Sequence, residues 1–300
     1  MDTSSTRPIE ASSVAAFVGC TLIWGSTFLF IRIGHDSLPP MWAAALRLSI
    51  AAAILFAILA VRRERLPGGA ARTAAVGFGL LQFGVNFPLL YWGELAVPSG
   101  LTAVIFATIP VSGALLAAAF GVERLSPLRL IGGLVSLAGI AVVFSSELRG
   151  AGILPMLAVF GATIAAVLGS LVLKSGPRQS PIAANAVGAL VGAVVCIALS
   201  VSCGESRTLP GTTTAWLSVL YLAIAGSVGA FVLWAWLVNR WEVSRVSFMA
   251  VLTPLIALSL GALVRHERLG PLTLLGAAIV LAGVLLGLGL VKGPRGATTR

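Results

Sequence analysis

Ten long apolar runs, separated by charged residues or by Pro and Gly, dominate this sequence of 300 residues. A helix needs about 20 apolar residues to cross the hydrocarbon layer of a bilayer, and each run is close to that length. Hydrophobic residues make up 58% of the chain and charged residues 10%, as expected for a membrane protein. The predicted membrane-crossing helices are 14–33, 42–61, 73–93, 98–120, 127–145, 152–173, 181–202, 214–236, 244–264 and 271–290.

The basic residues indicate which way the helices cross the membrane, because Lys and Arg concentrate in cytoplasmic loops. With a cytoplasmic N-terminus, the outer connections hold four of them, Arg149, Arg207, Arg265 and Arg268. We therefore expect residues 1–13 and 291–300 to be cytoplasmic tails of a multi-pass protein in the cell (inner or plasma) membrane. The inner segments hold Arg7, Arg62, Arg63, Arg65, Arg72, Arg124, Arg129, Lys174, Arg178, Arg240, Arg245, Lys292, Arg295 and Arg300.

One decapeptide occurs twice, as ERLSPLRLIG at 123–132 and as ERLGPLTLLG at 267–276, and the copies lie 144 residues apart. Five predicted helices separate the copies, and an odd number of crossings places them on opposite sides of the membrane. The sequence therefore predicts two inverted five-helix repeats, 14–146 and 152–290, around a central cavity. The same offset pairs Pro110 with Pro254, Trp92 with Trp236, Phe87 with Phe231 and Gly139 with Gly283.

Inverted repeats are typical of transporters, because a site between two such halves can open to either side by equivalent motions. The stretches LIWGSTFLFIR (Leu22 to Arg32) and ALRLSIAAAILF (Ala45 to Phe56), with the two ERL-x-P junctions, resemble the ten-helix, EamA-type branch of the drug/metabolite transporter superfamily. The resemblance covers nearly the whole chain and is greatest to amino-acid exporters of the YddG type. It implies a basket-like bundle with a central cavity, and export of small metabolites, often amino acids or amphipathic compounds.

Polar and aromatic residues at mid-membrane depth are the candidates for contact with a solute. Gln82 and Asn86 are four residues apart and so share a helical face, where a plain interhelical hydrogen bond is the alternative role. Trp24 lies too deep for the aromatic belt and either packs in the core or forms a cavity wall. The predicted substrate cavity is lined by Trp24, Gln82, Asn86, Tyr91, Thr163 and Ser247; Tyr91 can instead be a belt residue, and the two hydroxyls can instead serve close packing.

Arg47 is the one cation well inside a predicted helix, seven residues or roughly 10 Å from Pro40. A charge at that depth is costly. It either binds a substrate carboxylate as a bidentate fork or reaches the outer interface and pairs with Asp36 or Glu94, and we favour the second role. Because no other basic residue lies near mid-depth, sugar phosphates and nucleotide sugars are disfavoured as substrates.

Three prolines, Pro88, Pro110 and Pro254, fall inside predicted helices, where each removes a backbone donor and frees a carbonyl. We expect kinks there, which either act as hinges or are static bends held by packing. Pro127 and Pro271 instead follow the repeated ERL tripeptides and fit the first turn of a helix.

The residues give no support to an enzyme. Neither GxSG, GxGD nor HExxH occurs, and the two histidines, His35 and His266, fall in predicted outer connections. The three cysteines lack the number and spacing of a disulfide framework or metal site, so we expect no metal and no cofactor. The net charge of +10 lies in the breaks between apolar runs, which indicates membrane orientation and not a nucleic-acid partner. A membrane-embedded enzyme and a purely structural membrane protein are the alternatives from other classes.

The acidic residues bear on energy coupling, because a proton-driven carrier usually places a carboxylate within the membrane. All ten acids of this chain fall in predicted connections or at helix ends, and Glu94, at an outer helix end, is the best remaining candidate for a proton site. We therefore expect a uniporter that exports small metabolites, above all amino acids, by alternating access, with the lipid bilayer and the small-molecule substrate as its partners. The alternative is a proton-coupled exporter of drugs or amphipathic compounds; the solute, the net direction and the oligomeric state are left open.

Overall fold

The computed structural model describes residues 10–97, 102, 105–143, 152–265 and 271–289, and within them the regular structure is helical. Six helical stretches are long and apolar enough to cross a membrane by length and composition, and four shorter apolar stretches complete the ten crossings that the sequence predicts. The six are α1 (Ala11–His35), α2 (Pro40–Arg62), α3 (Gly69–Gly79) with η1 (Leu80–Val85) and α4 (Asn86–Gly93), α8 (Ile153–Ser175), α9 (Pro181–Ser202), and α10 (Thr213–Tyr221) with η2 (Leu222–Gly229) and α11 (Ala230–Val238). The four are α6 (Ile109–Ala119), α7 (Pro127–Val143), α12 (Val243–Val246) with α13 (Met249–Arg265), and α14 (Pro271–Gly287).

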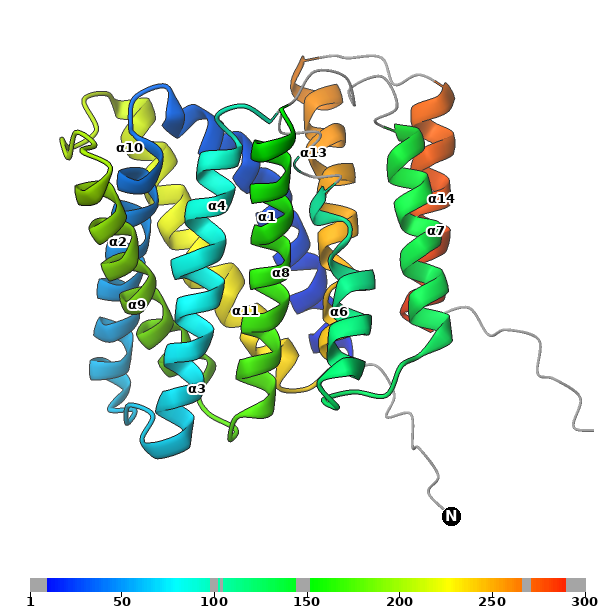
Figure 1. Cartoon of the computed structure of the whole chain (residues 1–300), viewed down its shortest axis with the longest axis horizontal. Helices are drawn as coiled ribbons and strands as arrows, with labels where there is room; N and C mark the ends of the chain where they lie inside the picture. The colour runs from blue at the N-terminus through cyan, green and yellow to red at the C-terminus, as the bar shows by residue number, and fades with distance from the viewer. Residues whose placement is uncertain (1–9, 98–101, 103–104, 144–151, 266–270, 290–300) are drawn as a thin grey trace, which may run out of the picture.

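The helices form one bundle in which α2, α9 and α10 lie at one edge and α7 and α14 stand side by side at the other (Figure 1). The connections α2–α3, α6–α7, α8–α9 and α11–α12 lie at the lower end of Figure 1, which we call the inner end. Helix α13 finishes and α14 begins at the opposite, outer end. The first ERL-x-P sequence therefore lies at the inner end, whereas residues 267–270 of the second lie outside the described residues and connect two helices that meet at the outer end. The predicted fold of two inverted five-helix repeats is confirmed.

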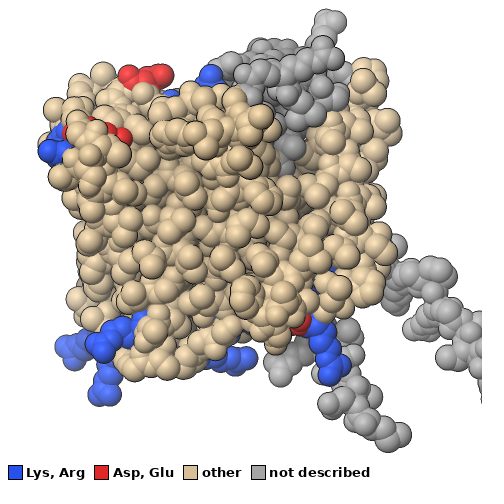
Figure 2. Space-filling view, in the orientation of Figure 1, with Lys and Arg blue, Asp and Glu red and all other residues tan. Residues whose placement is uncertain are grey.

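The surface of the bundle matches a bilayer. In the view of Figure 2, Lys and Arg lie near the two ends, mostly at the inner one, and the wall between them shows no charged residue. Large apolar side chains project from this kind of wall on several helices, with Leu22, Leu157, Leu217 and Leu281 all exposed. In water such a surface would drive association, whereas lipid tails solvate it.

Helices α7 and α14 pack on each other through glycines. A Cβ atom added at Gly132 would lie 2.5 Å from the backbone N of Gly287, and one at Gly139 would lie 2.7 Å from the N of Val280. Only glycine permits so close an approach of two helix backbones, which is the usual role of small residues in membrane helix pairs. The GxxxG pair of Gly283 and Gly287 thus serves a contact inside one chain.

Two π-helical segments, η1 and η2, interrupt the third helix of each repeat at matching positions, since the repeat offset of 144 places Leu80 on Ile224 and Val85 on Gly229. Pro88 follows η1 in the first turn of α4, but the second repeat has Val232 at the matching position and still forms η2. Proline is therefore not what produces the wider turn. Such segments are rare and occur often at functional sites.

The other prolines divide into helix starts and one interior position. Pro127 and Pro271 are the first residues of α7 and α14, which confirms their predicted place. Pro110 lies in the first turn of α6, directly after the turn at Ala107 and Thr108 that separates α6 from the helical residues Ile105 and Phe106, and a hinge role there stays a prediction. Its missing N–H is an orphan donor at a helix start in any case. Pro254 lies inside α13 as predicted; a hinge role at Pro88 or Pro254 stays a prediction.

Candidate functional site

A cavity lies between the two repeats at mid-depth of the bundle, with walls from α1, α2, η1, α4, α6, α8, α11, α12 and α13. Its surface is mostly apolar, with a few polar groups that converge on one space, the usual composition of a small-molecule site. None of the described residues that line it is acidic. The lining residues are Trp24, Thr27, Phe28, Ile31, Arg47, Gln82, Asn86, Phe87, Leu90, Phe106, Ile109, Ala166, Ser170, Phe231, Trp234, Val246, Ser247, Met249, Ala250 and Thr253.

The π-helical segment η1 explains why Gln82 is followed on the cavity wall by two adjacent residues of the third helix. Its hydrogen bonds span five residues and not four, so one turn is wider than in an α-helix. Residues four and five positions further along the chain therefore both face the same side. Gln82 in η1 is thus followed on the same wall by both Asn86 and Phe87 at the start of α4. Asn86 is 3% exposed, and its Oδ1 atom is buried without a hydrogen-bond partner among the described residues. The amide is therefore free to bind something that enters the cavity.

Arg47 lies in the cavity wall and is 3% exposed. Its Nε donates to Ser227 Oγ at 2.8 Å, its Nη1 donates to Tyr91 Oη at 3.2 Å, and its Cζ lies 4.7 Å from the centroid of the Phe87 ring. The described residues contain no ion pair between Arg47 and an acid, so the favoured prediction of a pair with Asp36 or Glu94 is wrong. The reason is rotational: this face of α2 points into the bundle and not toward the outer interface.

The second π-helical segment, η2, contacts the Arg47 guanidinium through two of its residues. Ser227 of η2 supplies the hydroxyl, and its neighbour Gly226 supplies the space, since a Cβ added there would lie 3.1 Å from Arg47 Nη2. The hydroxyl that holds Arg47, that of Ser227, thus comes from the second repeat, and the Gln82 and Asn86 amides of the cavity wall come from the first. The sequence carries no signal for Ser227, because its role depends on the π-helical turn.

Glu94 follows the last residue of the third crossing, at the outer end. Both of its carboxylate oxygens are buried without a hydrogen-bond partner in the described part of the chain. Burial raises the pKa of Glu94 to about 8, although the nearby positive charges of Arg32 and Arg47 act in the opposite direction. Burial thus favours the neutral form of this carboxyl, and no ion pair joins it to Arg47 in the described part of the chain.

Aromatic side chains form much of the apolar wall. The ring of Phe231 lies 5.1 Å from Trp24, 6.2 Å from Phe87 and 6.1 Å from Trp234, centroid to centroid. Trp234 is 6% exposed, so it is a cavity residue and not a member of the aromatic belt. Phe87 and Phe231 occupy matching positions of the two repeats, which is the one sequence signal that could have identified this pair.

The structure brings Trp24, Gln82, Asn86, Arg47 and Ser247 to the cavity wall. As contacts for a solute they stay predictions. It does not bring the two other predicted lining residues there. Tyr91 is 1% exposed and lies behind Arg47, where it accepts the guanidinium hydrogen bond. Thr163 is fully buried and donates to Phe160 O of its own helix at 2.7 Å.

The comparisons with known proteins agree with this architecture. The model of the EamA-like transporter family matches the chain twice, over residues 11–145 and 153–288. The chain belongs to this family of transporters. The drug/metabolite transporter resemblance of the sequence is thereby confirmed, and the family is one of transporters and not of enzymes.

Several curated proteins match over most of their length. The uncharacterized inner membrane transporter YedA of Escherichia coli (strain K12) is 32% identical over 266 residues, covering 88% of this chain and 87% of that protein. A probable terminal-alkyne amino-acid exporter of Streptantibioticus cattleyicolor is 31% identical and covers 92% and 93%. A probable amino-acid metabolite efflux pump of Escherichia coli (strain K12) is 25% identical and covers 88% and 91%. A crystal structure that is 19% identical, with a TM-score of 0.80 over 95% of this chain and 100% of that chain, has the same fold.

Proposed function

We propose that this protein exports amino acids, or metabolites of the same charge pattern, through the cavity between its two repeats by alternating access. It does so as a multi-pass protein of the inner membrane with both termini in the cytoplasm. The observation that carries the proposal is the Arg47 guanidinium, which is buried in the cavity wall and has only neutral hydrogen-bond partners among the described residues.

The argument from Arg47 is electrostatic. A buried charge is costly unless another charge or a full set of hydrogen bonds compensates it. Two hydroxyls and an aromatic face compensate Arg47 in part, and Nη2 has no hydrogen-bond partner among the described residues. A solute carboxylate would complete the set with a charge-assisted hydrogen bond, worth about 1.5–3 kcal/mol.

The rest of the cavity suits the rest of an amino acid. A solute ammonium group needs acceptors, and the Asn86 Oδ1 atom is an acceptor without a hydrogen-bond partner among the residues that the structure describes, with Gln82 one turn away on the same wall. The side chain of the solute would lie against Trp24, Phe87 and Phe231. Two curated relatives whose names specify amino-acid compounds support this choice of solute.

Purified protein in proteoliposomes tests the proposal. We expect efflux of an amino acid such as L-phenylalanine to exceed that of its amide, L-phenylalaninamide, which lacks the carboxylate. Equal rates for the two would contradict a carboxylate site. Product formation without flux would favour an enzyme, and neither flux nor product would favour a structural role.

We propose further that transport is uniport. The support is that none of the described residues lining the cavity is acidic, so a proton has no carboxylate to bind beside the solute. Efflux of a zwitterionic amino acid should then run without an imposed pH gradient, and an ionophore that collapses such a gradient should leave the initial rate unchanged.

Proton-coupled export is the second candidate, and Glu94 favours it. A buried carboxyl with a pKa of about 8 is protonated below that pH and ionised above it, so it can bind and release a proton within the physiological range. Under this candidate an imposed pH gradient would drive accumulation against the solute gradient, and Glu94→Gln would abolish the accumulation. If accumulation occurs and survives in Glu94→Gln, Glu94 is not the coupling site.

A further inference from the structure

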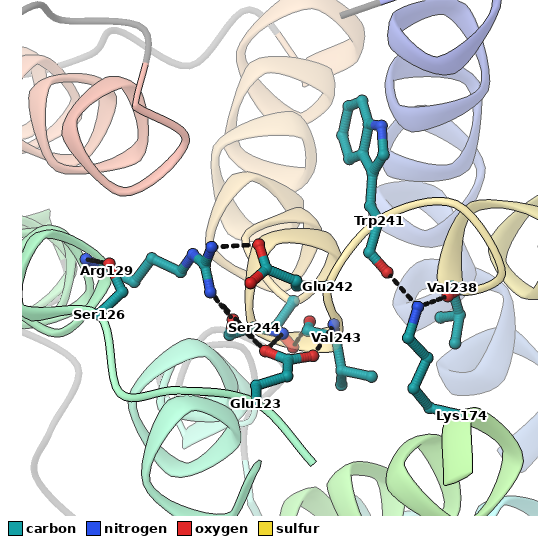
Figure 3. Close-up of polar contacts among 10 residues, drawn as sticks. Glu123, Ser126, Arg129, Lys174, Val238, Trp241, Glu242, Val243 and Ser244 are labelled. Carbon is teal, nitrogen blue, oxygen red and sulfur yellow. Dashed lines mark hydrogen bonds and ion pairs between the residues drawn. The ribbon is translucent and has the colours of Figure 1, made fainter. Parts of the chain in front are cut away.

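A cluster of charged residues joins the α6–α7 connection to α12 at the inner end of the bundle, and neither the fold nor the solute site accounts for it (Figure 3). Glu123 and Arg129 come from the α6–α7 junction and the start of α7, in the first repeat. Glu242 and Ser244 come from the α11–α12 connection and α12, in the second repeat. We call these four residues the inner cluster.

Glu123 caps a helix that lacks a cap of its own. Glu242, the residue before α12, makes no side-chain cap hydrogen bond, so the first backbone N–H groups of α12 need an external acceptor. The Glu123 carboxylate accepts hydrogen bonds from Val243 N, from Ser244 N at 3.4 Å and from Ser244 Oγ at 2.6 Å. The negative charge also favours the positive end of the helix dipole.

Arg129 ties the same helix to α7. Its Nη1 donates to Ser244 Oγ at 2.9 Å and lies 3.8 Å from Glu123 Oε2, and its Nη2 pairs with Glu242 Oε2. The side chains of Glu123 and Arg129 are 5% and 15% exposed, so water screens this pair weakly. One guanidinium is thus shared between two carboxylates from the two repeats.

The helix that the cluster holds is a short element at the base of the cavity. Helix α12 has four residues and is followed by a turn at Ser247 and Phe248 before α13 begins. Val246 and Ser247, which come directly after the capped residues, line the cavity. A four-residue helix between non-helical connections can shift without unwinding a long helix, and any shift moves the cavity wall.

The sequence at the matching outer positions cannot build the same cluster. The offset of 144 gives Glu267 for Glu123, but it gives Thr273 for Arg129, Pro98 for Glu242 and Gly100 for Ser244. Three of the four partners are lost, and with them the cation and the second carboxylate. Two inverted repeats that were identical would favour neither side, so the inner cluster biases the protein toward closure of its inner end.

We propose that Glu123 and Arg129 form a latch that holds α12 and keeps the cavity closed at the inner end, so that release of this latch is the step that admits solute from the cytoplasm. The proposal rests on the alternating access of the proposed function. It does not depend on which solute is carried.

Sided cysteine labelling tests the latch without any solute. In a background with Cys203→Ser, which removes the exposed native thiol, one reporter is Ser170→Cys near the inner end of the cavity and the other is Thr27→Cys toward its outer end. Arg65→Cys, in the exposed α2–α3 connection, marks the inner side. A membrane-impermeant thiol reagent is applied to membrane vesicles of either orientation.

We expect Glu123→Ala to raise the labelling rate of the inner reporter about tenfold and to lower that of the outer reporter. Glu123→Gln should act in the same direction with a smaller change. The matched control is Glu205→Ala, because Glu205 accepts hydrogen bonds from Met41 N at 3.1 Å and Trp42 N at 2.8 Å and so caps α2 by the same chemistry at the outer end. It should leave the inner labelling rate unchanged.

Three outcomes would overturn the latch. One is an unchanged inner rate in both Glu123 variants. Another is a rise at both reporters together, which would mean a loosened structure and not a change of sides. The third is that neither Glu123 variant accumulates in the membrane while Glu205→Ala does, which would make Glu123 a folding residue. None of these outcomes bears on whether amino acids are the solute, so the two proposals fail separately.

Discussion

Arg129 and Arg47 are both largely buried arginines, and they differ in what compensates their charge. Arg129, at the inner end, is paired with Glu123 and Glu242 from both repeats. Arg47, in the cavity wall, has the hydroxyls of Ser227 and Tyr91 and the face of Phe87, and forms no ion pair within the described part of the chain. A charge that the protein neutralises itself can hold elements together. A charge that the protein does not neutralise is available to bind a ligand. Substitution of the two arginines should therefore affect different properties of the protein.

The largest effect is expected for Arg47→Gln. It should lower proteoliposome efflux of an amino acid by about 10- to 100-fold, because a charge-assisted hydrogen bond of about 1.5–3 kcal/mol is lost. Efflux of the amino-acid amide should change little, so the preference for the acid over the amide disappears. Arg47→Lys, which keeps the charge but not the planar fork, should fall between.

Arg32→Gln is the matched control for Arg47, since Arg32 lies in α1 and does not line the cavity. It should retain the preference for the acid. Equal losses for acid and amide in Arg47→Gln would show that the residue supports the structure of the cavity and does not bind the carboxylate.

A smaller effect of another kind is expected for Arg129→Gln. Removal of the shared guanidinium breaks the ion pairs of Glu123 and Glu242 with Arg129, and a shift of about 1 kcal/mol in the balance between inner-closed and inner-open states changes their ratio about fivefold. Labelling of the inner Ser170→Cys reporter should rise by that factor, while the ratio of acid to amide efflux should not change. A changed ratio would remove the distinction between the two arginines.

The smallest effect is expected for Ser227→Ala, which removes the hydroxyl that accepts the Arg47 Nε hydrogen bond at 2.8 Å. One hydrogen bond of about 0.5–1.5 kcal/mol corresponds to a loss of about 2- to 10-fold in the preference for acid over amide. Tyr91→Phe removes the longer bond of 3.2 Å and should cost less. A loss in Tyr91→Phe larger than in Ser227→Ala would mean that Tyr91 sets the orientation of the guanidinium.

The crossings were predictable from the sequence, because the thickness of a bilayer fixes the length of each apolar run. So were the starts of α7 and α14, because Pro127 and Pro271 fit only the first turn of a helix that follows a polar connection. The depth of each residue in the membrane was also predictable from its position in an apolar run. This depth identified Trp24, Gln82 and Asn86, which all line the cavity.

Rotation about the helix axis was not predictable in the same way. Arg47 lies at the expected depth, but its side chain points into the cavity. Thr163 hydrogen-bonds to the backbone of its own helix, and Tyr91 is buried behind Arg47, so neither lines the cavity. In a membrane protein apolar residues face both lipid and core, so the hydrophobic pattern does not separate the two faces. The π-helical segments η1 and η2 also rotate the residues that follow them about the helix axis, and no residue type in the sequence predicts these segments.

The shared position of η1 and η2 also says something about ancestry. A wide turn of this kind holds more residues than an α-helical turn, and each repeat carries one at the same place although the surrounding sequences differ. Two separate insertions at one point would be a coincidence that a single inheritance avoids. This is the pattern that duplication of a five-helix unit already containing the wide turn would give. The side chains on the two turns differ, with Gln82 in one half and Ser227, which holds Arg47, in the other.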